Sequence, residues 1–526
     1  MPTGNYQLRE KVNNYRKGNH SKQCIQWLEY MMAEKGIFIR HGENNPHGEL
    51  RIDNFSVDGY HAETRTVYEF HGCYFHGHCG LNYDPKKWRE TRERIEKIEQ
   101  LGYKVVETTS CEWERLNIKF PVTPRVICTR KDIEDAIITD ESFGIVKCSL
   151  HVPPDLIEHF SEFPPIFKNT EITMADIGEH MQEYARSIQR VKGVEKSLIS
   201  SMHGDIVILT PLFKKYIEMG LICTDIEWII EYNPKEVFKW FEDEVIDDRR
   251  TADLDPNHKA RAETSKTQGN CAYGRCVIDK TKHCSCRFVS EDNLGIHISN
   301  PRFKTLEELG DGIFEVVKGK KKVVLDTPIQ VGIAVYSYAK LNLINFWEFI
   351  NKYLVNDLYQ LMECDTDSLY IAIAEDTIEE CVKPELIKEF HRVKHEFLAS
   401  QDNTPMKFKG EYITRKQYEK RTGGLYKEEF NGVGMICLNS KVYHIWSEDD
   451  TKTACKGMQM KRNKLIRDDF LDQLENPRKK HFVENAGFIR DGLDTRTYTQ
   501  TKKGLNYFYC KRKVLSDGIS TTHLDI

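Results

Sequence analysis

The chain of 526 residues carries 76 Lys and Arg against 81 Asp and Glu, a formal net charge of −5. This balance excludes a protein that is strongly basic over its whole surface, although a local basic groove stays compatible with it. The length predicts roughly three or four domains. Because 40% of the residues are hydrophobic, the chain can form packed cores, which excludes a disordered or fibrous protein.

The sequence also bears on the compartment. It contains no apolar run of about 18 residues that would span a membrane, and its mean hydropathy is −0.57. The polar start, MPTGNYQLREKVNNYRKG, lacks the apolar stretch of a signal peptide. The 16 cysteines are too dilute for a disulfide scaffold, and several lie near histidines. We therefore expect an intracellular protein with no membrane partner, in nucleus, cytoplasm or organelle.

The first region, from Ser21 to Arg115, has the pattern of a small α/β unit. A capped, amphipathic helix is predicted up to Gly36, and a strand over 66–70. Asp84 and Pro85 open a second helix that Gly102 ends, and a further strand follows over 103–106.

In the rest of the chain, the elements are predicted from the positions of proline and glycine and from the hydrophobic periodicity. Residues 117–139 are rich in proline and charge and are predicted to be a connector. Strands are expected over 144–148 and 205–210, separated by about 50 charged and mostly helical residues, and helical, basic sequence is expected up to residue 282. Residues 330–373 are predicted to be a long helix and then a strand. The tail 502–513 interleaves Lys and Arg with aromatic residues, which suits either contact with a nucleic-acid backbone or a solvated edge strand.

An acidic turn lies in front of that last strand. Asp365 and Asp367 are two residues apart, so both carboxylates can face one side of a tight turn and share Mg²⁺ or Mn²⁺. Since Asp-Thr-Asp-Ser is also ordinary turn chemistry, a solvated β-turn is an equally good interpretation of this segment alone.

A second motif lies about 100 residues upstream of the turn. In the segment Lys266-Thr-Gln-Gly-Asn270-Cys-Ala-Tyr273-Gly, the three numbered side chains share one helical face, where a cation can meet a triphosphate beside an aromatic ring. A solvated helix with a core tyrosine is the alternative. This segment resembles the Lys-x-x-x-Asn-x-x-Tyr-Gly motif of family B DNA polymerases, and the acidic turn resembles the Asp-Thr-Asp-Ser motif of the same family.

A third segment, Ser440-Lys441-Val442-Tyr443, resembles the Lys-x-Tyr motif of that family. The resemblance covers residues 143 to 526 and is closest to the protein-primed branch found in viruses and transposons. It implies that Asp365 and Asp367 bind the catalytic metals. It also implies that Lys266 binds the nucleotide phosphates, that Asn270 and Tyr273 contact the nascent base pair, and that Lys441 and Tyr443 contact the primer strand.

One element of the family pattern is missing. The first palm motif, Asp-x-x-Ser-Leu-Tyr-Pro, which supplies the other metal-binding aspartate, does not occur in the sequence, and no segment is recognised as a proofreading exonuclease of the family. The chain is therefore expected to be a fragment, one piece of a split gene, or a decayed copy. An upstream polymerase chain or a terminal protein primer is an expected partner.

The first region contains a dense cluster of metal-binding residue types. Three histidines and two cysteines fall within nine residues, at positions 71, 73, 76, 78 and 79. Core cysteines with surface histidines are the alternative. The segment resembles very short patch repair endonucleases, relatives of the restriction-enzyme fold. That resemblance implies a structural Zn²⁺ site whose ligands are Cys73, His78, Cys79 and Cys111.

The same resemblance implies a nuclease site. Asp58 would hold a catalytic Mg²⁺, and His71 and His76 would act on the attacking water or the leaving group. Glu69, two residues before His71, completes an Asp…Glu-x-His set that is close to the Asp…Glu-x-Lys of restriction enzymes.

Together these features predict a multidomain α+β and α/β protein. A repair-endonuclease-like, zinc-bearing domain (20–116) precedes a polymerase right hand. The further boundaries are a connector (117–142), palm (143–230), fingers (231–290), palm again (291–445) and a thumb or C-terminal region (446–526). The leading function is DNA-directed DNA polymerase activity in DNA replication, with primer–template DNA and deoxynucleoside triphosphates as partners. The alternatives are a metal-dependent endonuclease that carries a decayed polymerase platform, and a DNA-binding protein without catalytic activity.

Overall fold

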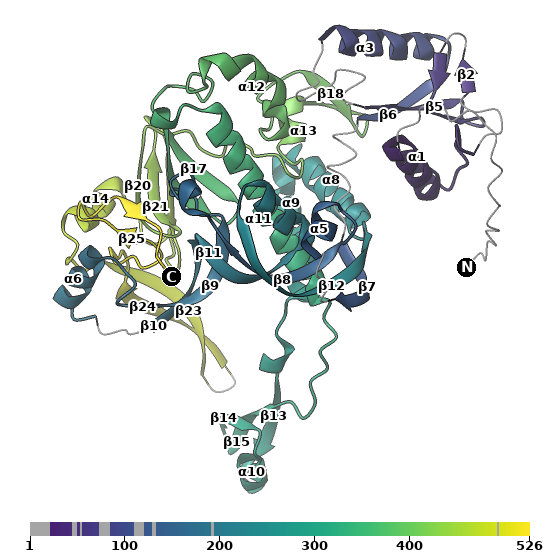
Figure 1. The fold of residues 1–526 in the computed structure, drawn as a ribbon. Coiled ribbons are helices and arrows are strands. Elements are labelled where there is room, and N and C mark those ends of the chain that lie inside the picture. Colours follow the sequence, from purple (N-terminus) through teal and green to yellow (C-terminus); the bar gives the residue numbers. More distant parts are fainter. Residues whose placement is uncertain are drawn as a thin grey trace. The chain divides into compact units, whose positions relative to one another are not determined.

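A computed structural model gives the fold as a mixed α/β arrangement (Figure 1). The described residues are 22–44, 50–52, 55–72, 85–109, 120–128, 133–190, 194–491 and 494–526. The chain divides into two compact units. The first unit comprises Met1–Ile118 with Glu385–Leu398, and the second unit comprises Lys119–Pro384 with Ala399–Ile526.

The first unit has a four-stranded sheet in the order β1-β4-β5-β6, in which β5 and β6 are parallel. Its elements are α1 (Lys22–Lys35), β1 (Arg40–His41), β2 (Leu50–Ile52), β3 (Phe55–Val57), β4 (Gly59–His61), β5 (Thr66–His71), α3 (Pro85–Gln100), β6 (Lys104–Thr109) and α12 (Ile387–Val393). The predicted helices and strands are confirmed here. Gly36 and Gly102 follow the two helices with positive φ, at 62° and 84°, as glycines at helix ends do.

The core of this unit lies where α1 packs on the sheet. Trp27 and Leu28 of α1, exposed by 4% and 0%, pack with Tyr68 and Phe70 of β5. All six residues of β5 are buried. A strand with both faces covered holds its side chains in fixed positions, so the polar residues Glu69 and His71 are fixed as well.

The second unit is built on an antiparallel sheet in the order β11-β8-β12-β7. The strands are β7 (Phe120–Cys128), β8 (Gly144–His151), β11 (His203–Leu209) and β12 (Ile222–Lys235). Helices α5 (Ile133–Ile138), α7 (Thr210–Glu218) and the long α11 (Ile329–Tyr353) contact this sheet. Val331 and Ala334 of α11 pack with Ile145 and Leu209 in its core.

The sheet corrects two expectations. The predicted connector contains β7 and α5, and β7 is the edge strand, where the prolines at 121 and 124 are tolerated because one side of an edge strand needs no ladder hydrogen bonds. The sequence after Gly220, expected to be helical, is the strand β12. Its pairing with β8 and with β7 contains register shifts, so its burial does not alternate and the period of a strand is hidden.

The segment expected to be mostly helical between β8 and β11 is also different. It forms the antiparallel pair β9 (Ile166–Thr173) and β10 (Val194–Ser201), and the nine-residue helix α6 (Glu179–Ser187) lies between them in the chain. Most positions of β9 are at least partly exposed, which explains why charged residues occupy a strand.

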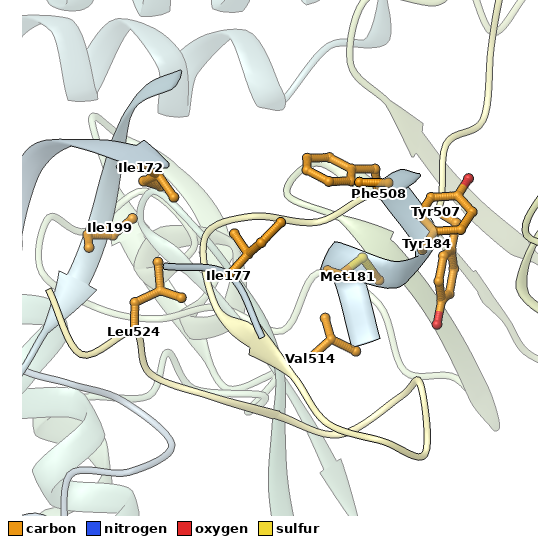
Figure 2. Packing of buried hydrophobic residues seen from close by; sticks show 10 residues of the cluster. Ile172, Ile177, Met181, Tyr184, Ile199, Tyr507, Phe508, Val514 and Leu524 are labelled. Carbon is orange, nitrogen blue, oxygen red and sulfur yellow. The ribbon is translucent and has the colours of Figure 1, made fainter. Parts of the chain in front are cut away.

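The C-terminal tail packs against this segment. Figure 2 shows Tyr507, Phe508, Val514 and Leu524 in one apolar cluster with side chains of the β9 to β10 region. The latter are Ile172, Ile177, Met181, Tyr184 and Ile199. The aromatic residues of the tail are therefore core residues, and neither nucleic-acid contact nor a solvated edge strand describes them.

Two helices, α8 (Lys239–Asp253) and α9 (Lys259–Cys276), pack on each other, and α9 also packs on α11. After them, β13 (Cys284–Ser290), α10 (Glu291–Ile298), β14 (Phe303–Gly310) and β15 (Ile313–Gly319) form a small three-stranded sheet with one helix.

The rest of the second unit consists of hairpins and short helices. These are β16 (Tyr359–Asp365), β17 (Ser368–Ile373), β18 (Pro405–Phe408), β19 (Glu411–Thr414), α13 (Arg415–Glu419), β20 (Gly434–Asn439), β21 (Val442–Trp446), β22 (Thr451–Cys455), α14 (Arg467–Glu475), β23 (Phe482–Asp491), β24 (Asp494–Lys503), β25 (Lys513–Val514) and β26 (Thr521–Thr522). Among the described residues, no helix combines the length and the apolar character needed to cross a bilayer.

Candidate functional site

The acidic turn joins β16 to β17, as the sequence predicts. Asp367 donates its backbone N–H to the carbonyl of Asp365 at 2.7 Å, and Thr366 between them has a φ of 64°. The side chain of Asp365 is 21% exposed, while Asp367 is exposed. The two carboxylates therefore lie on one tight turn, and one of them is open to solvent.

Lys441, from the turn between β20 and β21, meets this acidic turn. Its ammonium forms an ion pair with the Asp365 carboxylate and donates to Thr366 Oγ1 at 3.0 Å. Two motifs that are 76 residues apart in the chain thus share one contact. The structure brings Lys441 and Asp365 together directly.

Tyr443 lies differently from Lys441. Its side chain is only 3% exposed, and its hydroxyl lies 2.5 Å from the hydroxyl of Tyr370 in β17. Burial is the main reason that the pKa of Tyr443 is raised, and the hydrogen bond with Tyr370 raises it further. The ring packs on the ring of Tyr370, with the ring centroids 4.8 Å apart, and is therefore not open to a primer strand.

The carboxylates of Glu363, Asp365 and Asp367 lie close to buried neutral groups at the acidic turn. Burial raises the pKa of the Cys364 thiol to about 12, and the neighbouring carboxylates of Glu363, Asp365 and Asp367 add to the shift. Burial also raises the pKa of Tyr426, and the negative charge of Asp367 raises it further. The Tyr426 ring stacks on Phe346, with the ring centroids 4.0 Å apart. The Lys441 ammonium balances part of this negative charge through its ion pair with Asp365.

The predicted face of α9 is accessible. Lys266 and Asn270 are exposed, and Tyr273 is half-buried with its ring edge-on to Tyr336, at 6.2 Å between ring centroids. Ala262, Ser265 and Cys276 are the buried residues of the same helix. A helix packed by one face and open on the face of Lys266 and Asn270 can present these side chains to a ligand.

Only part of a two-metal site is present among the described residues. Asp365 and Asp367 can hold one Mg²⁺ that keeps several of its waters. No group of three or more His, Cys, Asp or Glu side chains suited to a metal occurs in the described parts of the chain. Two bridging metals need carboxylates from more than one strand, so the described residues fit a single Mg²⁺ and not a pair.

The first unit contains a charged cluster that the sequence showed only in part. Glu69, 2% exposed, is bound by the Arg94 guanidinium at 2.6 and 3.1 Å. His71 Nε2 lies 2.9 Å from Glu107 Oε2, and Arg92 of α3 also binds Glu107. Burial opposes ionisation of Glu107, but the hydrogen bonds from Arg92 and His71 outweigh it and lower its pKa to about 2.

Asp58 joins this cluster through the backbone. Its Oδ2 accepts the N–H of Phe70 at 2.7 Å, which brings the carboxylate beside the chain segment of Glu69 and His71. Asp58, Glu69 and His71 therefore lie in or beside one strand, but Arg94 neutralises Glu69, and the three side chains do not form a metal-binding group in the described part of the chain. The predicted residues Cys73, His76, His78, Cys79 and Cys111 lie outside the described residues, so the zinc site stays a prediction.

Sequence reasoning missed several members of both clusters. Glu107 lies opposite Glu69 in the parallel register of β5 and β6, which only the fold reveals. Glu363 accepts the N–H of Lys441 at 3.1 Å, although its position two residues before Asp365 was a signal that could have found it. Burial raises the pKa of Glu363, and the Lys441 N–H and the Cys437 thiol counteract that shift.

Comparisons with known proteins give a distant structural likeness. No protein-family model and no curated protein matches the chain. Phi29 DNA polymerase complexed with primer-template DNA and incoming nucleotide substrates is similar at a TM-score of 0.37 and 12% identity, covering 74% of this chain and 55% of that chain. An orthorhombic crystal form of Phi29 DNA polymerase gives a TM-score of 0.33 and 12% identity, covering 74% and 54%. The chain thus spans about half the length of that polymerase. Because the likeness is this distant, we base the function on the site residues.

Proposed function

We propose that the second unit is a DNA-directed DNA polymerase of the family B type, or the palm-and-fingers part of one. It adds deoxynucleotides to a primer 3′ end in DNA replication, and its partners are primer–template DNA and deoxynucleoside triphosphates. The protein-primed branch of viruses and transposons is the proposed origin, with a terminal protein as a further candidate partner.

The contact of Lys441 with Asp365 and Thr366 is the observation that carries this proposal. These residues were singled out from two separate sequence motifs, and ordinary turn chemistry gives no reason for them to meet. The exposed face of α9 with Lys266 and Asn270, in the same unit, supports it further.

In the proposed reaction each side chain has a binding or orienting task. Lys266 binds the triphosphate, Asn270 and Tyr273 border the base pair, and Lys441 meets the primer phosphate nearest the carboxylates. Asp365 and Asp367 would hold one Mg²⁺ or Mn²⁺, which would supply Lewis-acid stabilisation of the charge on the reacting phosphate when it is bound.

The carboxylates of the described residues are too few for a metal pair, so the proposal has a second form. A separate upstream polymerase chain supplies the missing ligand, and this chain contributes the fingers and the acidic turn. Both forms predict that Asp367 is essential, because it is the exposed carboxylate of the turn.

Primer extension on a primed template with Mg²⁺ or Mn²⁺ tests the proposal. We expect extension by the wild type, loss of it in Asp367→Ala, and retention in Asp376→Ala, an exposed aspartate just beyond β17. A folded wild type that binds DNA but does not extend contradicts the single-chain form. Equal activity of the wild type and Asp367→Ala contradicts both forms.

For the first unit we propose an endonuclease-like role in gripping or cutting DNA. The hydrogen bond from Phe70 N–H to Asp58, beside Glu69 and His71, supports it. Plasmid cleavage with Mg²⁺ by the wild type and by Asp58→Ala is the test. Equal cleavage by the two proteins, or none by a folded wild type, argues against a cutting role.

A further inference from the structure

Glu363 links the acidic hairpin, through β16, to the strand β20 and to the turn that follows it. Its Oε1 accepts the backbone N–H of Lys441 at 3.1 Å, and its Oε2 accepts the thiol of Cys437 at 3.4 Å. Cys437 lies in β20, and Lys441 lies in the turn that leaves this strand. One carboxylate therefore ties β16 to both the strand and its turn.

Glu363 and Asp365 are two residues apart in β16. Residues i and i+2 of a strand point to the same face, about 6.6 Å apart, so Glu363 and Asp365 share a face. Lys441 has its backbone nitrogen at Glu363 and its ammonium at Asp365. Its side chain thus runs along the face of β16 from one carboxylate to the next.

The backbone of Lys441 needs such support. Its φ is 63°, a conformation that costs about 1 kcal/mol or more for a residue with a side chain. The turn is also held by Asn439 Nδ2, which donates to the carbonyl of Phe508 at 2.8 Å, and by Lys456 N–H, which donates to the Lys441 carbonyl at 3.0 Å. Of these hydrogen bonds, the one that the Lys441 N–H donates to Glu363 connects the turn to β16 of the acidic hairpin.

We propose that Glu363 is a positioning residue that fixes the Lys441 turn and thereby aims the Lys441 ammonium at Asp365 and Thr366. This inference rests on the proposed function, in which the Lys441 ammonium contacts a phosphate of the primer. In this role Glu363 acts only through Lys441, and that restriction makes the idea testable.

A double-mutant cycle on the full chain is the test, with affinity for primer–template DNA as the measurement. We expect Glu363→Ala to weaken binding about tenfold, the effect of losing a buried acceptor. Lys441→Ala should weaken it at least as much, and the double variant no more than Lys441→Ala alone. Glu363→Gln, which keeps an acceptor oxygen, should bind nearly as the wild type does.

Glu162 provides a matched control. Its carboxylate accepts the N–H of Leu361, at 3.4 Å, on the same strand β16 but away from the turn. Glu162→Ala should leave the affinity within about twofold of the wild type, since an exposed or weak hydrogen bond contributes little. If Glu363→Ala still weakens binding in the Lys441→Ala background, or if Glu162→Ala has the same effect, the positioning role is wrong.

Amide hydrogen exchange separates this proposal from the proposed function. In Glu363→Ala the amide of Lys441 should exchange at least about tenfold faster than in the wild type, while Glu162→Ala and Glu363→Gln leave it protected. This readout needs neither DNA nor activity. If the wild type does not bind primer–template DNA, the proposed function fails. Unchanged protection of the Lys441 amide in Glu363→Ala overturns the role of Glu363 in either case.

Discussion

The ammonium of Lys441 donates to the hydroxyl of Thr366 at 3.0 Å, and both residues have a positive φ, 63° and 64°. Thr366 is β-branched, so this conformation is especially rare for it. The strained β16–β17 turn and the strained β20–β21 turn are therefore in contact with each other. Strain of this kind persists where the surrounding contacts over-determine it, and it concentrates at functional sites.

We predict that Lys441→Ala makes DNA binding less sensitive to salt. A lysine that meets one phosphate releases about one counterion, so the slope of log affinity against log salt should become shallower by about 0.9. Titrations of primer–template DNA at several salt concentrations measure it. Lys416→Ala, at an exposed position of α13, serves as the control. An unchanged slope would mean that Lys441 does not contact a phosphate.

We predict that Gly144→Ala disrupts the central sheet of the second unit. A Cβ at this position would overlap the backbone carbonyl of Ile230 in β12, and backbone in a paired strand cannot move aside. Overpacking of this kind costs about 1–3 kcal/mol of unfolding free energy. Chemical denaturation measures it.

Gly295→Ala in α10 is the matched control for that prediction. Nothing lies within 4 Å of its Cβ position, so alanine should be neutral or stabilise the helix by about 0.5–1 kcal/mol. Equal loss of stability in both variants would show that the sheet is not the cause.

Part of the fold could be predicted because some elements carry local signals. α1, α3 and α11 show the apolar periodicity, caps or glycine stops that helices need, and β5 and β17 show strand patterns. The strands β7 and β12 could not be found in this way. Prolines interrupt the first, and register shifts disturb the alternation of the second, so only their partners in the sheet define them.

The candidate site divides in the same way. Asp365, Asp367 and Lys266 belong to short motifs with fixed spacing, and such spacing is visible in a sequence. The contact of Lys441 with Asp365 and the hydrogen bond to Glu363 depend on how two hairpins pack, which no local pattern encodes. Glu107 likewise meets His71 through the parallel pairing of β5 with β6.

We predict that Arg94→Met destabilises the first unit by about 3 kcal/mol, because it removes the guanidinium from the buried Glu69 carboxylate. The double variant Glu69→Leu with Arg94→Met should be markedly more stable than Arg94→Met alone, since no buried charge is left. Hydrogen exchange in β5 and β6 reports the stability of this unit. If the double variant is the less stable one, the ion pair is a net source of stability.

We predict a loss of first-unit stability in acid that depends on Glu107. The pKa of this carboxyl is lowered from 4.5 to about 2, by hydrogen bonds from Arg92 and His71 that outweigh its burial. A carboxyl with a lowered pKa stabilises the fold above its ordinary pKa, and this contribution is lost as the pH falls from about 4.5 toward 2. Because Glu107 is 35% exposed, solvent screening reduces the size of the effect.

Glu107→Gln separates this carboxyl from the other acidic groups of the chain. Hydrogen exchange of β6 in the wild type and in the variant, compared between pH 5 and pH 2.5, should show the wild type losing its advantage as the pH falls. At the lower pH the difference between the two proteins should be much smaller, because the Glu107 carboxyl of the unfolded chain is then protonated and folding has to release that proton. A difference that stays constant over this range would mean that Glu107 stabilises the sheet through packing and not through its charge.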